Sequence, residues 1–256
     1  MTTFEDVTEL SGSPISGEQL YRMYNRYSWT ADLSKDCDVL EVACGAGQGV
    51  GLIARQAKSV QAGDFSEVIL THARKHYGNR FTFTQFDAQD MPYADASFDV
   101  VVMHEALYYV PDAHRFMGEA RRVLRPGGRI LLTNSNKDLF DFNPSPHSTV
   151  YHGVIELRDL FQAHGYDTEF WGSQPLKEVG FVQKITRPAK QFAVKFGLMP
   201  KTMRSKQLLK RIIFGKPVRM PAEIMPNSSE REALAPLSAD QPCFTHKIIY
   251  CVAQEA

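Results

Sequence analysis

The sequence predicts an α/β protein in which a mixed sheet of seven strands is flanked by helices. Short apolar segments rich in β-branched residues alternate with segments of helical periodicity between residues 38 and 171. A glycine-rich turn follows the first of these apolar segments directly, in the stretch Asp38–Gly49. With 256 residues, the chain is long enough to bury the core of one large domain.

The first predicted strand and its turn organise the rest of the chain. Val39–Ala43 is an apolar run that contains one acid, Glu41, and three alternate glycines follow in Gly45–Gly49. Glycines allow the backbone to turn tightly and to approach a ligand closely, because they carry no Cβ. A strand, a glycine-rich turn and a helix (50–54) are typical of the opening of a nucleotide-binding βα unit.

Six further strands are expected downstream. The fourth is a continuous β-branched run, which indicates burial on both faces of a sheet. Between the fourth and fifth strands, Asp112 is expected to cap a helix that ends at a Pro-Gly turn. The six predicted strands are Ser59–Asp64, Phe81–Gln85, Ser97–Met103, Arg129–Thr133, Tyr166–Trp171 and Thr245–Val252.

Three motifs of the class I S-adenosylmethionine (SAM) dependent methyltransferases resemble segments of this chain. Motif I is similar to 38–49, because the acid lies inside the strand and the glycines follow G-x-G-x-G. Motif II resembles D-A-Q-D-M-P at 87–92, and motif III resembles the segment from Phe98 to Val110. The resemblance covers residues 38–171 and implies a Rossmann-like fold whose last strand runs antiparallel at the sheet edge.

The resemblance also assigns a cofactor, SAM, with S-adenosylhomocysteine as product. Glu41 would orient the methionine end, Asp64 the ribose hydroxyls, and Asp87 the adenine amino group. For Asp64 the alternative is a cap on the next helix, and for Asp87 a turn residue. The complete predicted cofactor set is Tyr27, Glu41, Ala43, Gly45, Gly47, Asp64, Phe65, Asp87, Ala88 and His104.

An N-terminal helix is predicted after a loose polar arm (1–16), with Ser16 as N-cap and Gln19 at the third helical position. One interpretation is that its aromatic residues pack on the sheet. In class I methyltransferases such a helix commonly covers SAM, and the resemblance then places Tyr27 or Arg26 on the SAM carboxylate.

Three histidines are candidates for a general base that accepts a proton from a hydroxyl acceptor. His104, followed by Glu105, lies past the carboxyl end of the fourth strand, where ligands bind in open parallel sheets. His147 and His152 lie in the polar-aromatic loop 134–153. The alternatives are a wall residue for His104 and solvated loop histidines for the other two.

No metal site is expected from the spacing of histidines and cysteines. His72 and His76 lie four residues apart on a helix without further ligands at suitable spacing, which indicates a surface pair. The four cysteines show no C-x-x-C pairing, so free thiols are expected.

The basic residues are concentrated in one segment. Lys184–Arg219 holds 11 of the 29 Lys and Arg residues and no Asp or Glu. Basic residues mixed with an apolar face are typical of a helix that lies on anionic lipid. The alternative is a helical insertion that packs on the sheet; no nucleic-acid motif accompanies the charge, so nucleic acid is not expected.

These observations predict a division into a 1–30 arm and lid helix, a 31–171 SAM-binding core, a 172–244 basic insertion and a 245–256 edge strand. The N-terminus lacks a basic start and an apolar core, which favours a cytoplasmic protein, with peripheral membrane contact as a further option.

The function expected from the resemblance is methyl transfer to a small-molecule acceptor. The polar loop and the basic segment favour O-methylation of a sugar or a glycolipid precursor. Methylation of a quinone-like or polyketide-like phenol is the alternative, and it predicts a more apolar loop. A third hypothesis is a scaffold at the membrane that binds SAM but does not catalyse methyl transfer.

Overall fold

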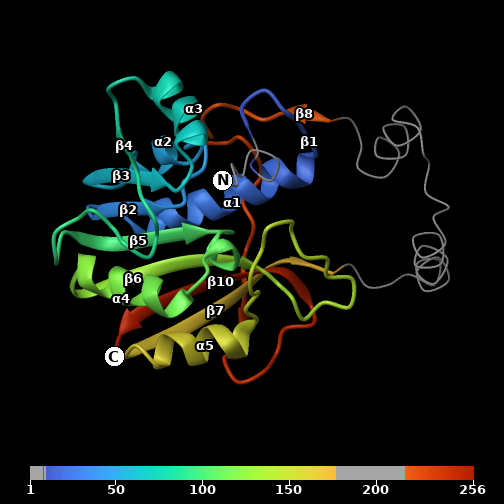
Figure 1. Cartoon of the computed structure of the whole chain (residues 1–256). Helices are drawn as coiled ribbons and strands as arrows, with labels where there is room; N and C mark the ends of the chain where they lie inside the picture. The colour runs from blue at the N-terminus through green and yellow to red at the C-terminus, as the bar shows by residue number, and fades with distance from the viewer. Residues whose placement is uncertain (1–7, 9, 177–216) are drawn as a thin grey trace.

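The computed structural model describes residues 8, 10–176 and 217–256. Its helices and strands alternate along the first two thirds of the chain, as the sequence predicts (Figure 1). The helices are α1 Gly17–Leu33, α2 Val50–Ile53, α3 Glu67–Tyr77, α4 Ala113–Val123 and α5 Val154–Gln162, with a short 3₁₀ helix, η1, at Leu107–Tyr109. The strands are β1 Pro14–Ile15, β2 Asp38–Val42, β3 Ser59–Asp64, β4 Thr82–Gln85, β5 Phe98–His104, β6 Leu124–Ser135, β7 Tyr166–Pro175, β8 Val218–Arg219, β9 Ala235–Leu237 and β10 His246–Glu255.

Eight of these strands form the central sheet, in the order β4-β3-β2-β5-β6-β10-β7-β9. Strands β2 to β6 are parallel to one another, and β10 is antiparallel to both β6 and β7. All seven predicted strands are present, and β9 adds an eighth at the edge. The α/β class and the Rossmann-like arrangement are thereby confirmed.

The predicted position of the last strand was wrong. Strand β10 does not lie at the edge of the sheet but between β6 and β7, so 246–255 is an interior strand. The sequence carries a signal for this position in the run Ile248–Cys251, whose four side chains are all buried. A strand covered on both faces reads as a continuous apolar run, whereas an edge strand tends to alternate.

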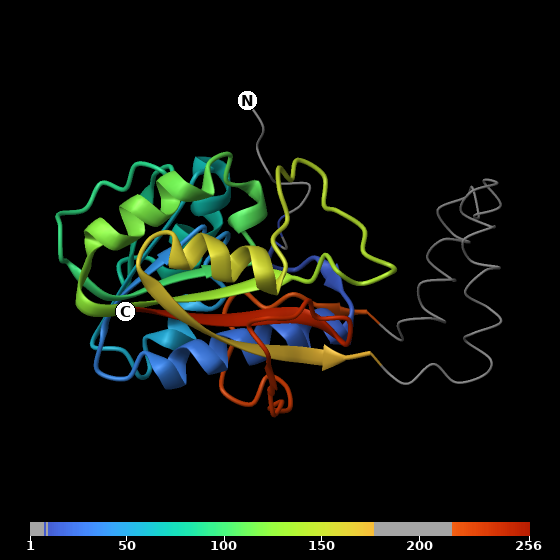
Figure 2. The same cartoon turned by 90° about the horizontal axis from the view of Figure 1, so that it is seen from below.

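The sheet separates two layers of helices. Side chains of β5 alternate between them: Val100 and Val102 face α1, α2 and α3, whereas Val101 and Met103 face α4 and α5. Figure 2 shows α1 and α5 on opposite faces of the sheet. All four of these β5 side chains are fully buried, which places the carboxyl end of β5 at the centre of the molecule.

Helix α1 begins as predicted. The Ser16 side chain accepts a hydrogen bond from the Gln19 amide at 3.1 Å, and the Gln19 side chain accepts one from the Ser16 amide at 2.8 Å. This capping box satisfies two amides that lack a partner within the helix. The described end of the preceding arm is not loose, however, because β1 pairs with β8 and anchors it.

Most of the predicted basic insertion lies outside the described residues. Of the segment 184–219, only 217–219 are described, so its helical and membrane-binding interpretations stay predictions. Strand β7 continues to Pro175, so the predicted boundary at 172 falls inside a strand. Within the described ranges, no helix is long and apolar enough to cross a membrane.

Candidate active site

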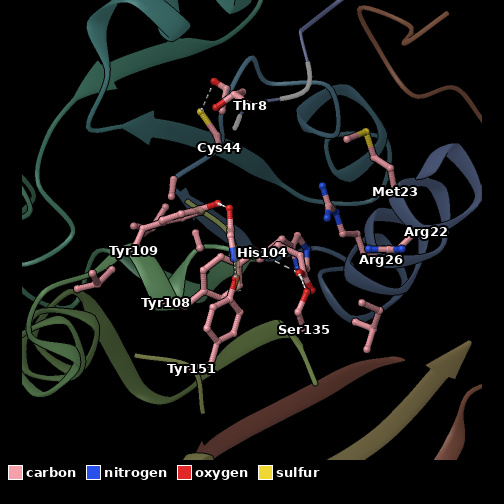
Figure 3. A pocket seen from close by; sticks show the side chains of 18 of the residues that line it. Thr8, Arg22, Met23, Arg26, Cys44, His104, Tyr108, Tyr109, Ser135 and Tyr151 are labelled. Carbon is pink, nitrogen blue, oxygen red and sulfur yellow. Dashed lines mark hydrogen bonds between the residues drawn. The ribbon is translucent and has the colours of Figure 1, made fainter. Parts of the chain in front are cut away.

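A cavity of about 800 Å³ lies at the carboxyl ends of the parallel strands. Residues that follow β2, β3, β4, β5 and β6 all line it, and helix α1 closes one side. In Figure 3, Arg22 and Arg26 of α1 approach from one side and Tyr108, Tyr109 and Tyr151 from the other, with His104 between them. This is where ligands bind in open α/β sheets.

The glycine turn after β2 forms one end of the cavity. Ala43, Gly45 and Gly47 all have positive φ angles, of 57°, 58° and 74°. Such angles are rare for residues with a side chain, which explains the two glycines and makes Ala43 a locally strained position. The Tyr77 hydroxyl holds the turn from behind, because it donates to the Gly47 carbonyl at 2.9 Å and accepts from the Gly51 amide at 3.2 Å.

Gly49 allows helix α1 to pack directly on this turn. An ideal Cβ on Gly49 would lie 2.0 Å from two carbon atoms of the Tyr27 ring, so no other residue fits without displacing the ring. Tyr27 is buried at 3 % exposure, and its hydroxyl donates to Glu41 Oε1 at 2.7 Å. Tyr27 therefore lines the cavity and connects α1 to the acid inside β2.

Glu41 is an acid buried in the core, with 1 % of its surface exposed. Burial raises its pKa to about 7, against the weaker lowering effects of Tyr27 and Arg26. Its second oxygen, Oε2, has no hydrogen-bond partner among the described residues. Glu41 lies within β2 and is not among the cavity-lining residues, so its contact with the methionine end of SAM stays a prediction.

The raised pKa of Glu41 predicts how protein stability depends on pH. Between the ordinary pKa and about 7, the folded state binds more protons than the unfolded state, so stability falls as pH rises. The contribution is fully present below the ordinary value and is lost as pH passes about 7. Glu41→Gln lacks this pH-dependent contribution. We therefore expect the free energy of unfolding of the variant, measured relative to that of wild type, to increase as pH rises from about 5 to about 8. Urea denaturation of both proteins checks this; parallel pH curves would contradict it.

The acid at the end of β3 lies where the sequence predicts. Asp64 lines the cavity, and its two oxygens accept from the Gly45 amide and the Ser66 amide, both at 2.9 Å. The helix-cap alternative does not describe this residue, because Ser66 is the N-cap of α3. Burial raises the pKa of Asp64 against these hydrogen bonds. Asp64 thus connects β3 to the glycine turn and faces the cavity.

Three further predicted cofactor residues also line the cavity. Phe65 lines the cavity and is 43 % exposed, which suits a side chain that covers a flat ring. Asp87 and Ala88 line it from the segment after β4. The Asp87 carboxylate accepts from the Gln89 amide at 2.8 Å, so it also shapes a local turn.

His104 lies at the centre of the cavity with both ring nitrogens occupied. Nε2 is 2.8 Å from the Thr30 hydroxyl and Nδ1 is 3.1 Å from the Thr133 hydroxyl. Burial and the nearby charge of Arg26 hold its pKa well below the ordinary value, so the ring is neutral. This geometry favours the wall role over that of a base.

The structure does not bring the other two histidines to the site. His147 is exposed, and neither it nor His152 is among the cavity-lining residues. The half-buried imidazole of His152 has a lowered pKa, caused chiefly by burial.

As for metals, no cluster of three His, Cys, Asp or Glu suited to a metal ion occurs in the described part of the chain. His76 instead contacts Glu223 at 2.9 Å.

The far end of the cavity contains residues that the sequence did not single out as catalytic. Ser135 at the end of β6 and Glu105 after β5 both line it. Tyr108 and Tyr151 stack with ring centroids 4.1 Å apart and form an aromatic wall. Their positions could have identified them from the sequence. Glu105 is the first residue after β5, and Ser135 is the last residue of β6.

Comparisons with known proteins agree with this geometry. Residues 40–132 match the methyltransferase domain family. A probable SAM-dependent methyltransferase of Mycolicibacterium smegmatis is 35 % identical over 136 residues, which are 52 % of each chain. The 27-O-demethylrifamycin SV methyltransferase of Amycolatopsis mediterranei is 33 % identical over 67 % of this chain and 66 % of its own. The chain spans about half the length of the first curated relatives it matches.

A solved structure shows the same fold. A SAM-dependent methyltransferase from Thermotoga maritima, described as a possible histamine N-methyltransferase, aligns with a TM-score of 0.57 and 16 % identity. The alignment covers 92 % of this chain and 90 % of that one. The chain belongs to the class I SAM-dependent methyltransferases, and SAM is the cofactor of that family.

The residues present fit SAM. The glycine turn leaves its backbone open to the cavity, and Asp64 and Asp87 offer carboxylates at the ends of neighbouring strands. A carboxylate accepts hydrogen bonds from vicinal hydroxyls or from an amino group. Gly45, Asp64, Phe65, Asp87 and Ala88 would therefore hold the nucleoside. Gly47, which was predicted with them, does not line the cavity and packs against Phe83 and Ala73.

Proposed function

We propose that this protein transfers the methyl group of SAM to a hydroxyl group of a small molecule. When bound, SAM supplies a methyl group already activated by its positively charged sulfur. The chain then has to orient two reactants and exclude water, which alone lowers a reaction barrier substantially. The family membership supports the methyl transfer, and the rifamycin relative, whose name places its methyl on an oxygen, supports a hydroxyl acceptor.

The observation that carries this proposal is the two-part lining of the cavity. One end has the glycine turn and the acids expected for a nucleoside, and the other has an aromatic wall with Glu105 and Ser135. Helix α1 closes the cavity between them with Met23 and Arg26. A chamber open to a second reactant beside the cofactor residues is what a transferase needs.

For the acceptor we propose a sugar or a glycolipid precursor. The lining contributed by the loop after β6 includes Asp141, Asn143 and Ser145, whose polar groups suit hydroxyls. The stacked pair Tyr108–Tyr151 offers a flat face, on which the apolar side of a sugar ring packs. The same face would accept a quinone-like or polyketide-like phenol, which is the alternative, and Leu139 and Phe142 add apolar surface for it.

The first experiment is a calorimetric titration with SAM and with S-adenosylhomocysteine, followed by a labelled-methyl screen of sugars, lipid-linked sugars and phenols. We expect micromolar binding of both compounds and label transfer to one acceptor class. Binding without label transfer to any acceptor would favour the non-catalytic scaffold. Failure of a folded sample to bind either compound would contradict the proposed function.

We further propose that the basic segment 184–219 contacts anionic membranes at their surface, in a protein of the cytoplasm. The proposal is supported by the composition of the segment, which has 11 basic residues and no acid. It rests on the sequence, because residues 184–216 lie outside the described part of the chain. We expect co-sedimentation with vesicles that contain anionic lipid, falling steeply as salt is raised, because salt screens exposed charges. Vesicles of neutral lipid are the control. Binding that is absent or independent of salt would favour a structural insertion.

A further inference from the structure

Helix α1 presents one face to the cavity, and this face carries two arginines. The side chains that line the cavity from α1 are Gln19, Arg22, Met23, Arg26 and Tyr27, which follow the spacing of a helix face. Arg26 lies toward the glycine turn, because its guanidinium carbon is 5.4 Å from the centre of the Tyr27 ring. Arg22 lies one helical turn earlier, about 6 Å away along the helix axis. The two arginines therefore face different parts of the cavity, and Arg26 is the one beside the cofactor residues.

Arg22 belongs to a cluster of charged side chains between α1 and β10. Lys247 of β10 donates to Glu18 Oε1 at 2.6 Å, and the Arg22 guanidinium lies 3.7 Å from the same oxygen. The Lys247 carbonyl accepts from the Asn136 amide at 2.9 Å, so this lysine lies beside the end of β6, at the far end of the cavity. Because two cations share one carboxylate, the cluster has a surplus of positive charge.

Both cations of this cluster are accessible. Arg22 and Lys247 line the cavity, and 29 % and 41 % of their side-chain surfaces are exposed. The contact from Arg22 to Glu18 is longer than a hydrogen bond, and Arg22 Nε has no hydrogen-bond partner among the described residues. A guanidinium has five N–H donors in a flat fork that matches two oxygens of a carboxylate or phosphate. Arg22 therefore has donors left for an anion in the cavity.

The acids that line the far end of the cavity belong to its aromatic side. Glu105 accepts from the Tyr108 hydroxyl at 3.2 Å. Asp141 precedes Phe142, whose ring centre lies 4.7 Å from that of Tyr151. In Figure 3 the labelled tyrosines lie across the cavity from the arginines of α1. Positive charge is therefore concentrated on the side formed by α1 and β10, where an anion would meet two cations.

We propose that Arg22 and Lys247 determine specificity for an acceptor that carries an anionic group, a phosphate or a carboxylate, near the hydroxyl that is methylated. The guanidinium fork of Arg22 binds two oxygens of the anion, and the Lys247 ammonium adds a point charge. The anion neutralises the surplus charge of the cluster, which would be costly to leave unpaired once the reactants fill the cavity. Phosphorylated sugars and sugar acids have this chemistry. This inference rests on the proposed function and narrows its substrate class to anionic sugars.

Arg22→Gln tests the proposal, because glutamine removes the charge and the fork but keeps a polar side chain. Arg22→Lys keeps the charge without the fork. The matched control is Arg121→Gln, which removes an arginine of α4 that is paired with Glu255 at 3.2 Å and is not among the cavity-lining residues. The melting temperature and the affinity for S-adenosylhomocysteine are measured for each protein.

Two assays then measure recognition of the anion. In the first, a panel of sugars is offered for label transfer, each sugar as the neutral compound, as its phosphate ester and as its acid. Comparison of the two charged forms identifies which anion the site prefers. In the second, inorganic phosphate is titrated into the S-adenosylhomocysteine complex by calorimetry, which requires no turnover.

For wild type we expect kcat/KM for one charged form to exceed that for the neutral form by about tenfold or more, because hydrogen bonds between charged groups are strong. Arg22→Gln should raise KM for the charged form and weaken phosphate binding, each by about tenfold or more. Its melting temperature, its affinity for S-adenosylhomocysteine and its activity on the neutral form should stay at wild-type values. Arg22→Lys should recover part of the loss, and Arg121→Gln should behave as wild type.

Three results would overturn the assignment. Wild type could prefer the neutral forms, or Arg22→Gln could bind phosphate and charged sugars as wild type does. If Arg22→Gln instead loses affinity for S-adenosylhomocysteine and keeps the preference for charged sugars, Arg22 serves the cofactor. Failure of the proposed function is distinct, because wild type would then bind no S-adenosylhomocysteine or label no sugar. Phosphate titration of wild type and Arg22→Gln would still decide whether the anion site exists.

Discussion

Replacing Asp64 by alanine is expected to weaken SAM binding by about 2 kcal/mol or more, because the variant loses an acceptor for ribose hydroxyls in a buried site. The same carboxylate accepts from the amides of Gly45 and Ser66. The variant therefore also leaves the Gly45 amide without its bond and loosens the glycine turn. Both effects act in the same direction on the affinity.

Calorimetric titration of Asp64→Ala with S-adenosylhomocysteine measures this effect directly. Asp167→Ala is the control, because Asp167 is an exposed aspartate on β7, away from the cavity. Asp64→Asn separates the two contributions, since asparagine retains one oxygen for the Gly45 amide. An affinity for Asp64→Ala equal to that of wild type would exclude the ribose role.

Replacing Gly49 by alanine should have the largest effect on stability, about 1–3 kcal/mol, because the added methyl group overlaps a buried ring. The ideal Cβ lies 2.0 Å from Tyr27 atoms, and the ring is enclosed by α1 and β2. Relief of the overlap requires Tyr27 to move, which breaks its hydrogen bond to Glu41. The affinity for SAM should fall together with the free energy of unfolding.

The matched control is the same change at a glycine with open space around it. Gly118 lies in α4, and no atom approaches within 4 Å of an added Cβ. Gly118→Ala should therefore raise the free energy of unfolding by about 0.5–1 kcal/mol, because alanine favours the helix. Urea denaturation compares the two variants with wild type. Equal effects of the same sign at both positions would contradict the packing argument.

Local sequence patterns predicted most of the sheet. The continuous apolar run at Val100–Met103 and the pair Gly45 and Gly47 each specify an element by themselves, because burial on two faces and positive φ angles leave few alternatives. The capping box at Ser16 and Gln19 specified the start of α1 in the same way. Such features depend on residues that are neighbours along the chain.

The errors concern partners that are distant along the chain. The order of β10 in the sheet depends on how a long connection returns. The apolar run Ile248–Cys251 indicates an interior strand but does not say which strands flank it. The pairing of β1 with β8 joins residues 14–15 to 218–219, so the arm looked loose when considered alone. Long-range pairing of this kind is specified by the packed structure as a whole.

The candidate site shows the same distinction. Asp64 and Asp87 were predictable because they occupy fixed places after strands, and both line the cavity. His104 was considered for its place after a strand and for its chemistry, and His147 and His152 for their place in the loop after the fifth predicted strand. Packing surrounds His104 with threonine hydroxyls and leaves His147 outside the cavity. The hydrogen bonds that join Glu105 to Tyr108 and Ser135 likewise connect residues on different elements.

The interior position of β10 sets an order for the assembly of the sheet during synthesis. Strands β2 to β6 can pair as soon as each is made, whereas β7 and β9 reach the sheet only through β10. Residues 246–255 must therefore leave the ribosome before β6 gains its second neighbour. Until then, β6 and β7 each expose an unpaired edge, which invites contact with other chains. A nascent or truncated chain that ends before residue 246 should depend on chaperones far more than one that contains β10.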